Sequence, residues 1–157
     1  MDAIALLKAD HVKVKELLAR LDATTERAKV ARRELFGRIK VELTVHETIE
    51  EEIFYPALKQ HPRAKDIVLE GIEEHNVVDT LLGELTALSP SHETWGAKAT
   101  VMRENLEHHI EEEETDMFVK ARNIFDRAEL TALGQRMAAR KITARADVKR
   151  IAAKREE

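Results

Sequence analysis

The ten residues HETIEEEIFY at positions 46–55 and the ten residues HIEEEETDMF at positions 109–118 are two copies of one pattern. In each copy a histidine precedes a glutamate by four residues, and an aromatic residue closes the segment. A second pair has nearly the same spacing, HVKVKELL at 11–18 and HNVVDTLL at 75–82. The offsets are 63 and 64 residues. We therefore expect two similar helical hairpins, related by a pseudo-twofold axis.

Apolar residues recur at intervals of three and four along most of the chain, which is the period of an amphipathic helix. Asp2 can cap the first helix, Pro62 and Pro90 mark connections, and Asp126 and Glu129 are spaced as a capping box. The predicted helices cover residues 3–22, about 26–59, about 63–88, about 91–122, and a fifth stretch from residue 126. Short connections make consecutive long helices antiparallel neighbours. We predict an all-α fold, an up-down-up-down antiparallel four-helix bundle with an additional C-terminal helix.

The C-terminal helix changes character along its length. Leu130, Leu133 and Met137 form an apolar stripe, so its first part is expected to pack on the bundle. Beyond Arg140 the helix is rich in Ala, Lys and Arg. We therefore divide the chain into a bundle domain with the start of the fifth helix, residues 1–140, and a basic helical extension, residues 141–157. The extension is expected to project, to fray, or to meet another subunit of a homo-oligomer.

The composition narrows the chemistry that the chain can perform. It has no cysteine, which excludes disulfides, thiolate zinc sites and cysteine-held iron–sulfur clusters. A net charge of −4 gives no reason to expect nucleic acid as a partner. No stretch approaches the ~20 apolar residues of a membrane span, and the N-terminal residues do not resemble a signal peptide. We therefore expect no membrane contact and a cytoplasmic location, and any metal must bind to imidazole and carboxylate groups.

Histidines and glutamates lie on the apolar faces of the predicted helices. Residues four apart share one face of a helix, so each His-x-x-x-Glu pair can serve one site. The neighbouring turns carry Leu43 and Ile53 in one copy and Leu106 and Met117 in the other, which identifies the buried side. A buried carboxylate without a partner is costly, and a set of six polar residues on matching faces favours a metal centre over packing. The predicted ligands are His11, His46, Glu50, His75, His109 and Glu113.

This ligand set has nitrogen and oxygen but no sulfur, which suits iron or manganese. Six protein ligands are more than a single tetrahedral zinc ion with an open position can bind. We predict two metal ions bridged by Glu50, Glu113 and a solvent-derived oxygen, each ion taking one histidine from a His-x-x-x-Glu helix and one from a single-histidine helix. Open positions would accept dioxygen, peroxide or nitric oxide. A ferritin-like site is excluded because it uses Glu-x-x-His, whereas Leu43, Ile72 and Leu106 stand three residues before the histidines.

Other histidines and acidic residues are expected to lie mostly on the surface. His61 and His92 fall at helix ends, and His108 lies on a less apolar stripe than His109. Within residues 111–114, only Glu113 is expected to face inward, and its companions to form a solvated face.

Three further residues could join the site, since each lies near a predicted ligand. Asp79 follows His75 by one turn and could ligate or hydrogen-bond, although a partly buried polar residue is the simpler interpretation. Glu47 could orient a ligand, but we expect it to be solvated. Tyr55 could donate to the site or ligate as phenolate, but its angular offset from Glu50 predicts a packing role.

The order of these motifs resembles the hemerythrin-like (HHE cation-binding) family. The likeness extends over about residues 4–137, and includes the Phe-Tyr-Pro at 54–56 and the Leu-Gly-x-x-Met at 133–137. It implies a non-haem di-iron centre, oxo- or hydroxo-bridged, in a four-helix bundle. Members of the family include oxygen carriers, iron or oxygen sensors, proteins of nitrosative or iron–sulfur stress, and peroxide-degrading proteins.

The sequence departs from the oxygen-carrier pattern of that family. Asp79 stands four residues after His75, where carriers have histidine. After His109, glutamates stand at four and five residues, Glu113 and Glu114, where carriers have an aspartate at five. More carboxylate should favour ferric iron, so we expect a protein that binds or reacts with a small oxidant in oxidative or nitrosative stress. A catalase- or peroxidase-like activity is left open. The alternatives are an iron- or oxygen-sensing or oxygen-binding module without turnover, and a purely structural metal protein.

Overall fold

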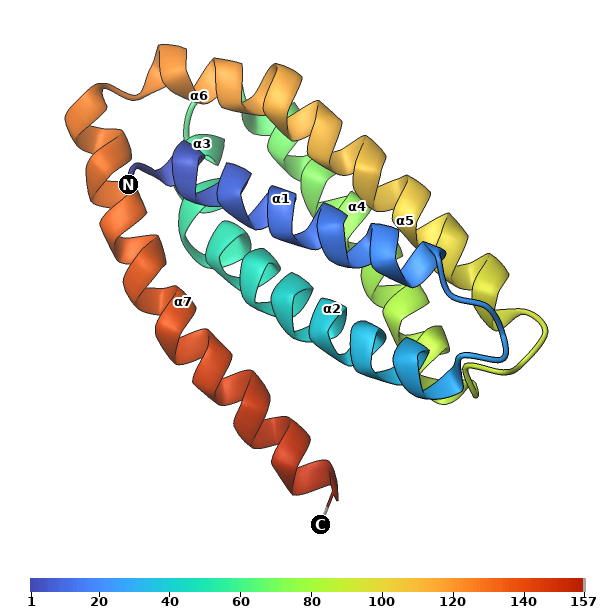
Figure 1. The fold of residues 1–157 in the computed structure, drawn as a ribbon. Helices are drawn as coiled ribbons and strands as arrows, with labels where there is room; N and C mark the ends of the chain where they lie inside the picture. The colour runs from blue at the N-terminus through green and yellow to red at the C-terminus, as the bar shows by residue number, and fades with distance from the viewer. Residues whose placement is uncertain (157) are drawn as a thin grey trace.

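The computed structural model describes residues 1–156, and all of its regular elements there are helical. Four long helices form the bundle, α1 (Ala3–Asp22), α2 (Lys29–Ile49), α4 (Lys65–Ala87) and α5 (Trp95–Glu112). Two of them continue through short π-helical turns, η1 (Glu50–Phe54) into α3 (Tyr55–Lys59), and η2 (Glu113–Met117) into α6 (Phe118–Ile124). The chain ends in α7 (Arg127–Glu156). Figure 1 shows α1, α2, α4 and α5 side by side and alternating in direction, which confirms the predicted bundle with an additional helix.

The helix ends follow from local hydrogen bonds. The Ala5 amide donates to Asp2 Oδ1 at 2.8 Å, as the predicted N-cap requires. The capping box before α7 is also confirmed, since the Glu129 amide donates to Asp126 Oδ1 at 2.8 Å. Helix α5 begins four residues later than predicted, at Trp95. Polar side chains of residues 89–94 hydrogen-bond to the loop backbone instead, and so compete with helix formation.

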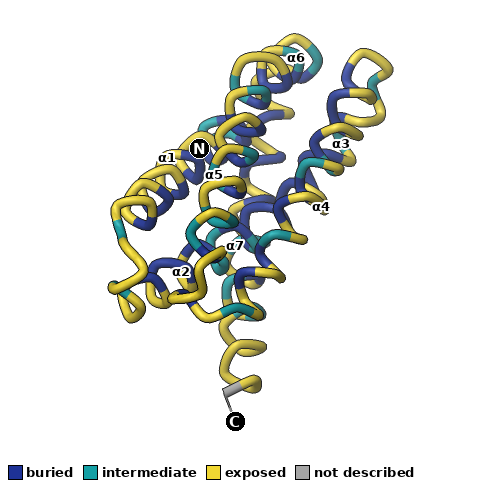
Figure 2. The backbone as a smooth tube through the Cα atoms, turned by 90° about the vertical axis from the view of Figure 1, so that its right-hand side faces the viewer, coloured by how far each residue is buried: buried dark blue, intermediate teal, exposed yellow. Residues whose placement is uncertain are grey.

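The core consists of two apolar clusters, with the polar residues between them along the bundle. One cluster fills the end of the bundle at which the chain begins, and includes Ile4, Leu7, Phe54, Leu58 and Phe118. The other lies toward the opposite end and includes Leu18, Ile39, Leu85, Trp95 and Met102. Figure 2 shows the buried residues on the inner sides of the helices. The four predicted histidine ligands fall in sequence between the two clusters, one on each long helix, so each is held between packed apolar layers.

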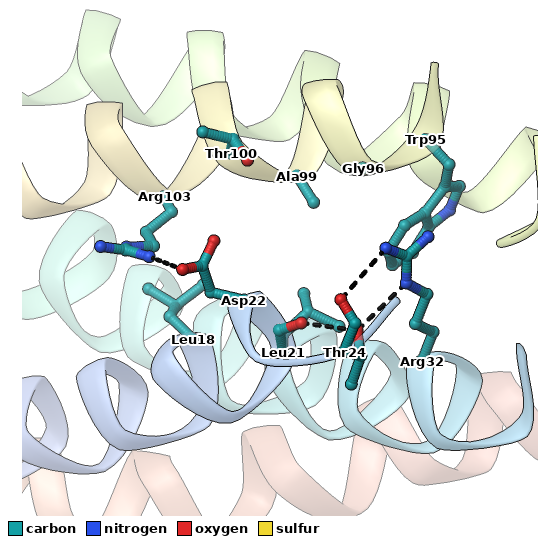
Figure 3. A pocket seen from close by; sticks show the side chains of 10 residues that line it. All are labelled: Leu18, Leu21, Asp22, Thr24, Arg32, Trp95, Gly96, Ala99, Thr100 and Arg103. Atoms are coloured by element: carbon teal, nitrogen blue, oxygen red, sulfur yellow. Dashed lines mark hydrogen bonds and ion pairs between the residues drawn. The ribbon is translucent and has the colours of Figure 1, made fainter. Parts of the chain in front are cut away.

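A buried arginine closes the second apolar cluster at its end of the bundle. Arg32 lies over the Trp95 ring at 5.2 Å and donates to the Pro90 carbonyl at 2.8 Å. Asp22 and Arg103 form an ion pair at 2.5 Å on the rim of the same pocket. Figure 3 shows these charged groups paired with neighbours. We interpret this pocket as a structural contact between α1, α2 and α5.

Helix α7 folds back along α1 and α2 (Figure 1). Gly134 allows its close approach, because a Cβ atom there would lie 2.5 Å from the Met1 carbonyl oxygen. From Arg140 onward three ion pairs bind α7 to the bundle, Arg140–Glu52 at 2.6 Å, Lys141–Asp10, and Arg145–Glu42 at 2.6 Å. The expectation that this stretch projects or frays is therefore wrong as far as Arg145. The division at residue 140 stays a prediction, although the helix is continuous there, and so does the homo-oligomer. Among residues 1–156, no helix has both the length and the apolar character to cross a bilayer.

Candidate metal centre

All six predicted ligands converge in the middle of the bundle. Each is at most 5% exposed. Their side chains form two overlapping groups whose potential ligand atoms lie within 4.8 Å of one another. One group is His11, His46, Glu50 and Glu113, and the other is Glu50, His75 and His109.

The two carboxylates lie between two pairs of imidazoles. Glu50 Oε1 lies 3.1 Å from His46 Nε2 and 3.2 Å from His75 Nε2. Helix α2, its continuation η1 and helix α4 bring these three side chains together, and Glu50 contacts His46 because they are one turn apart. This carboxylate therefore reaches one histidine of each half of the chain.

Glu113 repeats this arrangement across the pseudo-twofold axis. Its Oε1 atom lies 3.2 Å from His11 Nε2 and 3.3 Å from His109 Nε2. The ring centroids of His11 and His46 are 5.0 Å apart, and those of the other pair are 4.8 Å apart. Each pair joins one His-x-x-x-Glu helix to one single-histidine helix, which is the pairing proposed from the sequence.

A carboxylate lies beside the outer nitrogen of each histidine. An acceptor at Nδ1 favours a proton on that nitrogen, so that Nε2 of the neutral ring would be free to bind a metal. Three Nδ1 atoms are within hydrogen-bond distance of a carboxylate, His46–Asp10 at 3.0 Å, His11–Glu114 at 2.6 Å and His109–Glu74 at 2.7 Å, whereas His75 Nδ1 is 3.6 Å from Glu51.

These outer carboxylates were missed or misplaced in the sequence analysis. Asp10 and Glu74 directly precede His11 and His75, so the repeat itself carried the signal. The expectation that Glu114 belongs only to a solvated face is wrong, since it accepts from His11.

Several inward atoms have no hydrogen-bond partner among the described residues. They are His11 Nε2, Glu113 Oε1 and both carboxylate oxygens of Glu50. Such buried polar atoms are rare in native proteins unless an ion or water satisfies them. The donor set of imidazole nitrogens and carboxylate oxygens therefore fits metal ions at this position.

Without metal, His46 and His75 hold protons strongly. Burial lowers the pKa of His46, but Glu50 and Asp10 outweigh burial and raise that pKa well above its usual value. Burial also opposes the charged form of His75, yet Glu50 and Glu51 raise its pKa to about 10. A metal ion has to displace these protons, so metal affinity should fall as the pH falls.

Tyr55 reaches the centre, against the expectation that it points away. Its hydroxyl donates to Glu113 Oε2 at 2.8 Å and lies 3.4 Å from the Nε2 atoms of both His75 and His109. In an α-helix Tyr55 would stand about 140° around the axis from Glu50, at about 100° per residue. The π-helical turn η1, in which the Tyr55 amide donates to the Glu50 carbonyl, is wider and reduces this angle.

The equivalent turn in the second half places Phe118 against the other histidine pair. Its ring stacks on His11 with centroids 5.8 Å apart and an interplanar angle of 5°. Tyr55 stacks on His75 in the same way, at 5.4 Å. An aromatic ring thus packs on each histidine pair, but only the ring beside the His75–His109 pair, that of Tyr55, carries a hydroxyl.

The remaining candidates take other places. Glu47 is buried rather than solvated, and burial together with Asp79 and Glu51 raises its pKa to about 9, although His75 acts in the opposite direction. Asp79 is exposed instead of partly buried. His108 is 70% exposed and contacts Glu112 at 3.3 Å outside the centre.

The two histidines assigned to helix ends lie outside the centre as well. His92 is exposed. His61 is partly buried against Phe125, with ring centroids 5.5 Å apart.

The fold and this site define a helical bundle with a buried imidazole–carboxylate centre that could hold metal. The chain belongs to the hemerythrin HHE cation-binding domain family, whose family model matches residues 2–121. The family binds metal cations, typically iron.

Individual relatives agree with this assignment. The uncharacterized protein Rv2633c of Mycobacterium tuberculosis is 33% identical over 144 residues, which cover 89% of this chain and 85% of that protein. The crystal structure of a Mycobacterium kansasii homolog of Rv2633c, described as a hemerythrin HHE cation-binding domain-containing protein, is similar with a TM-score of 0.81. It is 29% identical, over 94% of this chain and 89% of that one. A Nostoc protein named DNA nickase is 29% identical over 75% of this chain, which spans about a third of that protein's length.

Proposed function

We propose that this protein holds two iron ions at the six-residue centre and binds or reacts with a small oxidant, namely peroxide, dioxygen or nitric oxide. The observation that carries the proposal is the position of Glu50 and Glu113, since each carboxylate contacts one histidine of each pair. Two carboxylates that each contact both imidazole pairs would hold two metal ions side by side, with the four histidines as their other ligands. When bound, the iron would supply the redox chemistry and the positions at which the oxidant binds.

The protein's own residues would orient the ligands and exclude water. Asp10, Glu74 and Glu114 hold three of the imidazole rings through Nδ1, and the two apolar clusters cover the centre from both ends. The Tyr55 hydroxyl donates its proton to Glu113 in a hydrogen bond. Tyr55 could give this proton to an oxygen atom of the oxidant, or lose it and bind a metal ion as phenolate.

The size of the inner cavity supports a small oxidant over an organic substrate. The cavity beside the four histidines has a volume of about 10 Å³. This is close to the minimum of ~10–15 Å³ that one water molecule requires. A molecule of two to four atoms is therefore a more suitable ligand than a larger one.

Iron loading followed by addition of peroxide tests the proposal. The protein reconstituted with ferrous iron should contain two ions per chain, and its near-ultraviolet absorption should change when hydrogen peroxide is added. Gas evolution would favour a catalase-like activity in oxidative stress. Two irons without any response to peroxide, dioxygen or nitric oxide would contradict the oxidant part of the proposal.

A sensing function is the second candidate, and α7 provides its specific support. Lys141 of α7 pairs with Asp10, which in turn accepts from His46. A change at the centre could therefore alter how α7 packs on the bundle. Different protection of α7 from hydrogen exchange in the iron-loaded and metal-free proteins would favour this function, and equal protection would contradict it.

A further inference from the structure

A groove between α2 and α4 leads from the surface toward the buried centre. Its volume is about 520 Å³. Carboxylates line the end near the centre, and two basic side chains also line the groove. The charged residues of the groove are Glu47, Glu51, Asp79, Lys40 and Arg155.

Glu47 separates this groove from the interior. It lines both the groove and the small cavity beside the histidines. Its side chain is 7% exposed, and Oε1 has no hydrogen-bond partner within residues 1–156. A buried carboxylate oxygen in this state requires a cation or a proton to compensate its desolvation. Glu47 is therefore a boundary residue with an unused ligand atom.

His75 presents a second unused ligand atom on the same side. Its Nδ1 atom is buried without a hydrogen-bond partner, 3.6 Å from Glu51 Oε2. Glu47, Glu51 and His75 each offer a potential ligand atom within 4.8 Å of the others. The opposite nitrogen of His75 faces the metal centre, so this histidine lies between the acidic cluster and the interior.

The internal repeat indicates that this acidic approach belongs to one half of the site only. The position equivalent to Glu47 in the second half is Ile110, and the position equivalent to Asp79 in the first half is Lys15. The metal position at His11 and His46 thus has an apolar and a basic residue where the other position has two carboxylates. Packing of a symmetrical bundle alone does not require this difference.

Lys40 does not cancel the charge of the acidic end. Lys40 precedes Glu47 by seven residues, which places it about 10 Å away along the helix axis at ~1.5 Å per residue. Its ammonium group donates to Thr86 at 3.1 Å. A cation at the acidic end therefore lies about one Debye length from Lys40 at physiological salt.

We propose that Glu47, Glu51 and Asp79 form an uptake site through which a divalent metal ion reaches the His75–His109 pair. The proposal rests on the metal-binding function above. Carboxylate oxygens would replace part of the hydration shell of the ion at the groove, and its remaining waters would be exchanged for imidazole and Glu50 inside. Uncharged dioxygen and hydrogen peroxide gain little from such carboxylates, so the site is specific for cation loading.

The rate of cobalt uptake by the metal-free protein tests this site. Co²⁺ bound to imidazole and carboxylate absorbs visible light, so loading can be followed without any activity of the iron protein. The double variant Glu51→Gln/Asp79→Asn removes the two exposed carboxylates of the groove and should take up Co²⁺ about tenfold more slowly, at the lower end of electrostatic effects on association rates. Its final content should remain two ions per chain. Glu51→Gln alone, at an exposed position, should slow uptake without disturbing the fold.

A matched control separates a local effect from a change in net charge. Glu16→Gln/Glu104→Gln removes the same charge at exposed positions on α1 and α5 and should load at the unmodified rate. Uptake by the groove variants at the unmodified rate would overturn the uptake site while leaving the centre intact. Failure of the unmodified protein to bind two Co²⁺ ions would overturn the proposed centre, and the uptake site with it.

Discussion

Among the individual residues, Glu50 is the clearest case of a charged group buried where only a cation can compensate it. Its carboxylate is fully buried, and neither oxygen has a hydrogen-bond partner in the described chain. Such a group destabilises a folded protein unless a cation compensates it. Without metal its cationic partners are the protonated rings of His46 and His75, whose pKa values it raises, and bound metal ions would take their place.

Replacing this carboxylate should remove both kinds of compensation. We expect metal-free Glu50→Gln to melt below the metal-free unmodified protein, because His46 and His75 lose the carboxylate that raises their pKa values, and we expect it to bind neither metal ion tightly. His46→Ala should likewise lose metal and the stability that metal provides. Thermal unfolding with and without metal measures both effects, with His92→Ala as a control that keeps full metal content. A Glu50→Gln protein that holds two irons and keeps the full metal-dependent stabilisation would contradict the assignment of Glu50 as a ligand.

Tyr55 is the residue that distinguishes one metal position from the other. Tyr55→Phe should retain two irons and its packing on His75, because only the hydroxyl is removed. If the hydroxyl supplies a proton, the rate of peroxide consumption should drop by about 10²-fold, the lower end of general acid–base contributions. Stopped-flow absorption gives the rate, and metal analysis gives the content. An unchanged rate would show that the hydroxyl only holds Glu113 in place.

The six central residues could be predicted from the sequence because they are repeated at a nearly constant offset on apolar faces. The structure brings them together, and their role as ligands stays a prediction. Tyr55 and Glu47 were misjudged for different reasons. The inward direction of Tyr55 depends on a π-helical turn, and the spacing of apolar residues does not reveal such a turn. The burial of Glu47 depends on which side chains of neighbouring helices surround it, and a single helical wheel does not contain that information.

At the scale of elements, α7 acts as a strap across α1 and α2. The sequence predicted its apolar first half through Leu133 and Met137, which are buried. Its charged second half could not be placed, since the acidic partners Asp10 and Glu42 are more than 100 residues away in the chain. Ion pairs between distant segments follow from the tertiary arrangement and have no local signature.

The strap should loosen at low pH. Burial opposes the charged form of Glu42, but Arg145 and Lys13 outweigh it and lower the pKa of this carboxyl. A lowered folded-state pKa gives stability that is present above the unfolded-state value of ~4.3 and is lost as the pH falls through the folded-state value. Hydrogen exchange in the second half of α7 should therefore rise below about pH 4. Protection that is unchanged down to pH 3 would contradict the ion-pair account.

One contact of the strap extends to the metal centre. Lys141→Met should release Asp10 from α7 and leave His46 less firmly oriented. Loss of an outer-sphere partner commonly reduces metal affinity by about 10–100-fold, and we expect the lower end here. Competition with a chelator measures the affinity. Lys149→Met, an exposed position on the same helix, is the control, and equal affinities of the two variants would refute the connection.

Considered as a whole molecule, the protein is a pseudo-symmetric bundle with a polar layer between two apolar clusters. The symmetry holds for the six central residues, the outer carboxylates and the π-helical turns. It breaks at Tyr55 and Glu47, which both lie beside the His75–His109 pair. The two metal positions should therefore differ in reactivity and in the rate at which they are filled.

Because the centre exists only in the folded state, metal and folding should be coupled. A ligand present at 1,000 times its dissociation constant stabilises a protein by about 4 kcal/mol. Iron should accordingly raise the melting temperature by several degrees, and a chelator at mildly acidic pH should reverse the gain, since protons compete for the histidines.

The number of iron ions per chain tests the central claim most directly. Native mass spectrometry of protein reconstituted with ferrous iron under anaerobic conditions gives this number without reference to any activity. The account predicts two ions in the unmodified chain and none held tightly by Glu50→Gln. A single ion, or two ions that persist when Glu50 is replaced, would contradict a centre bridged by the two carboxylates.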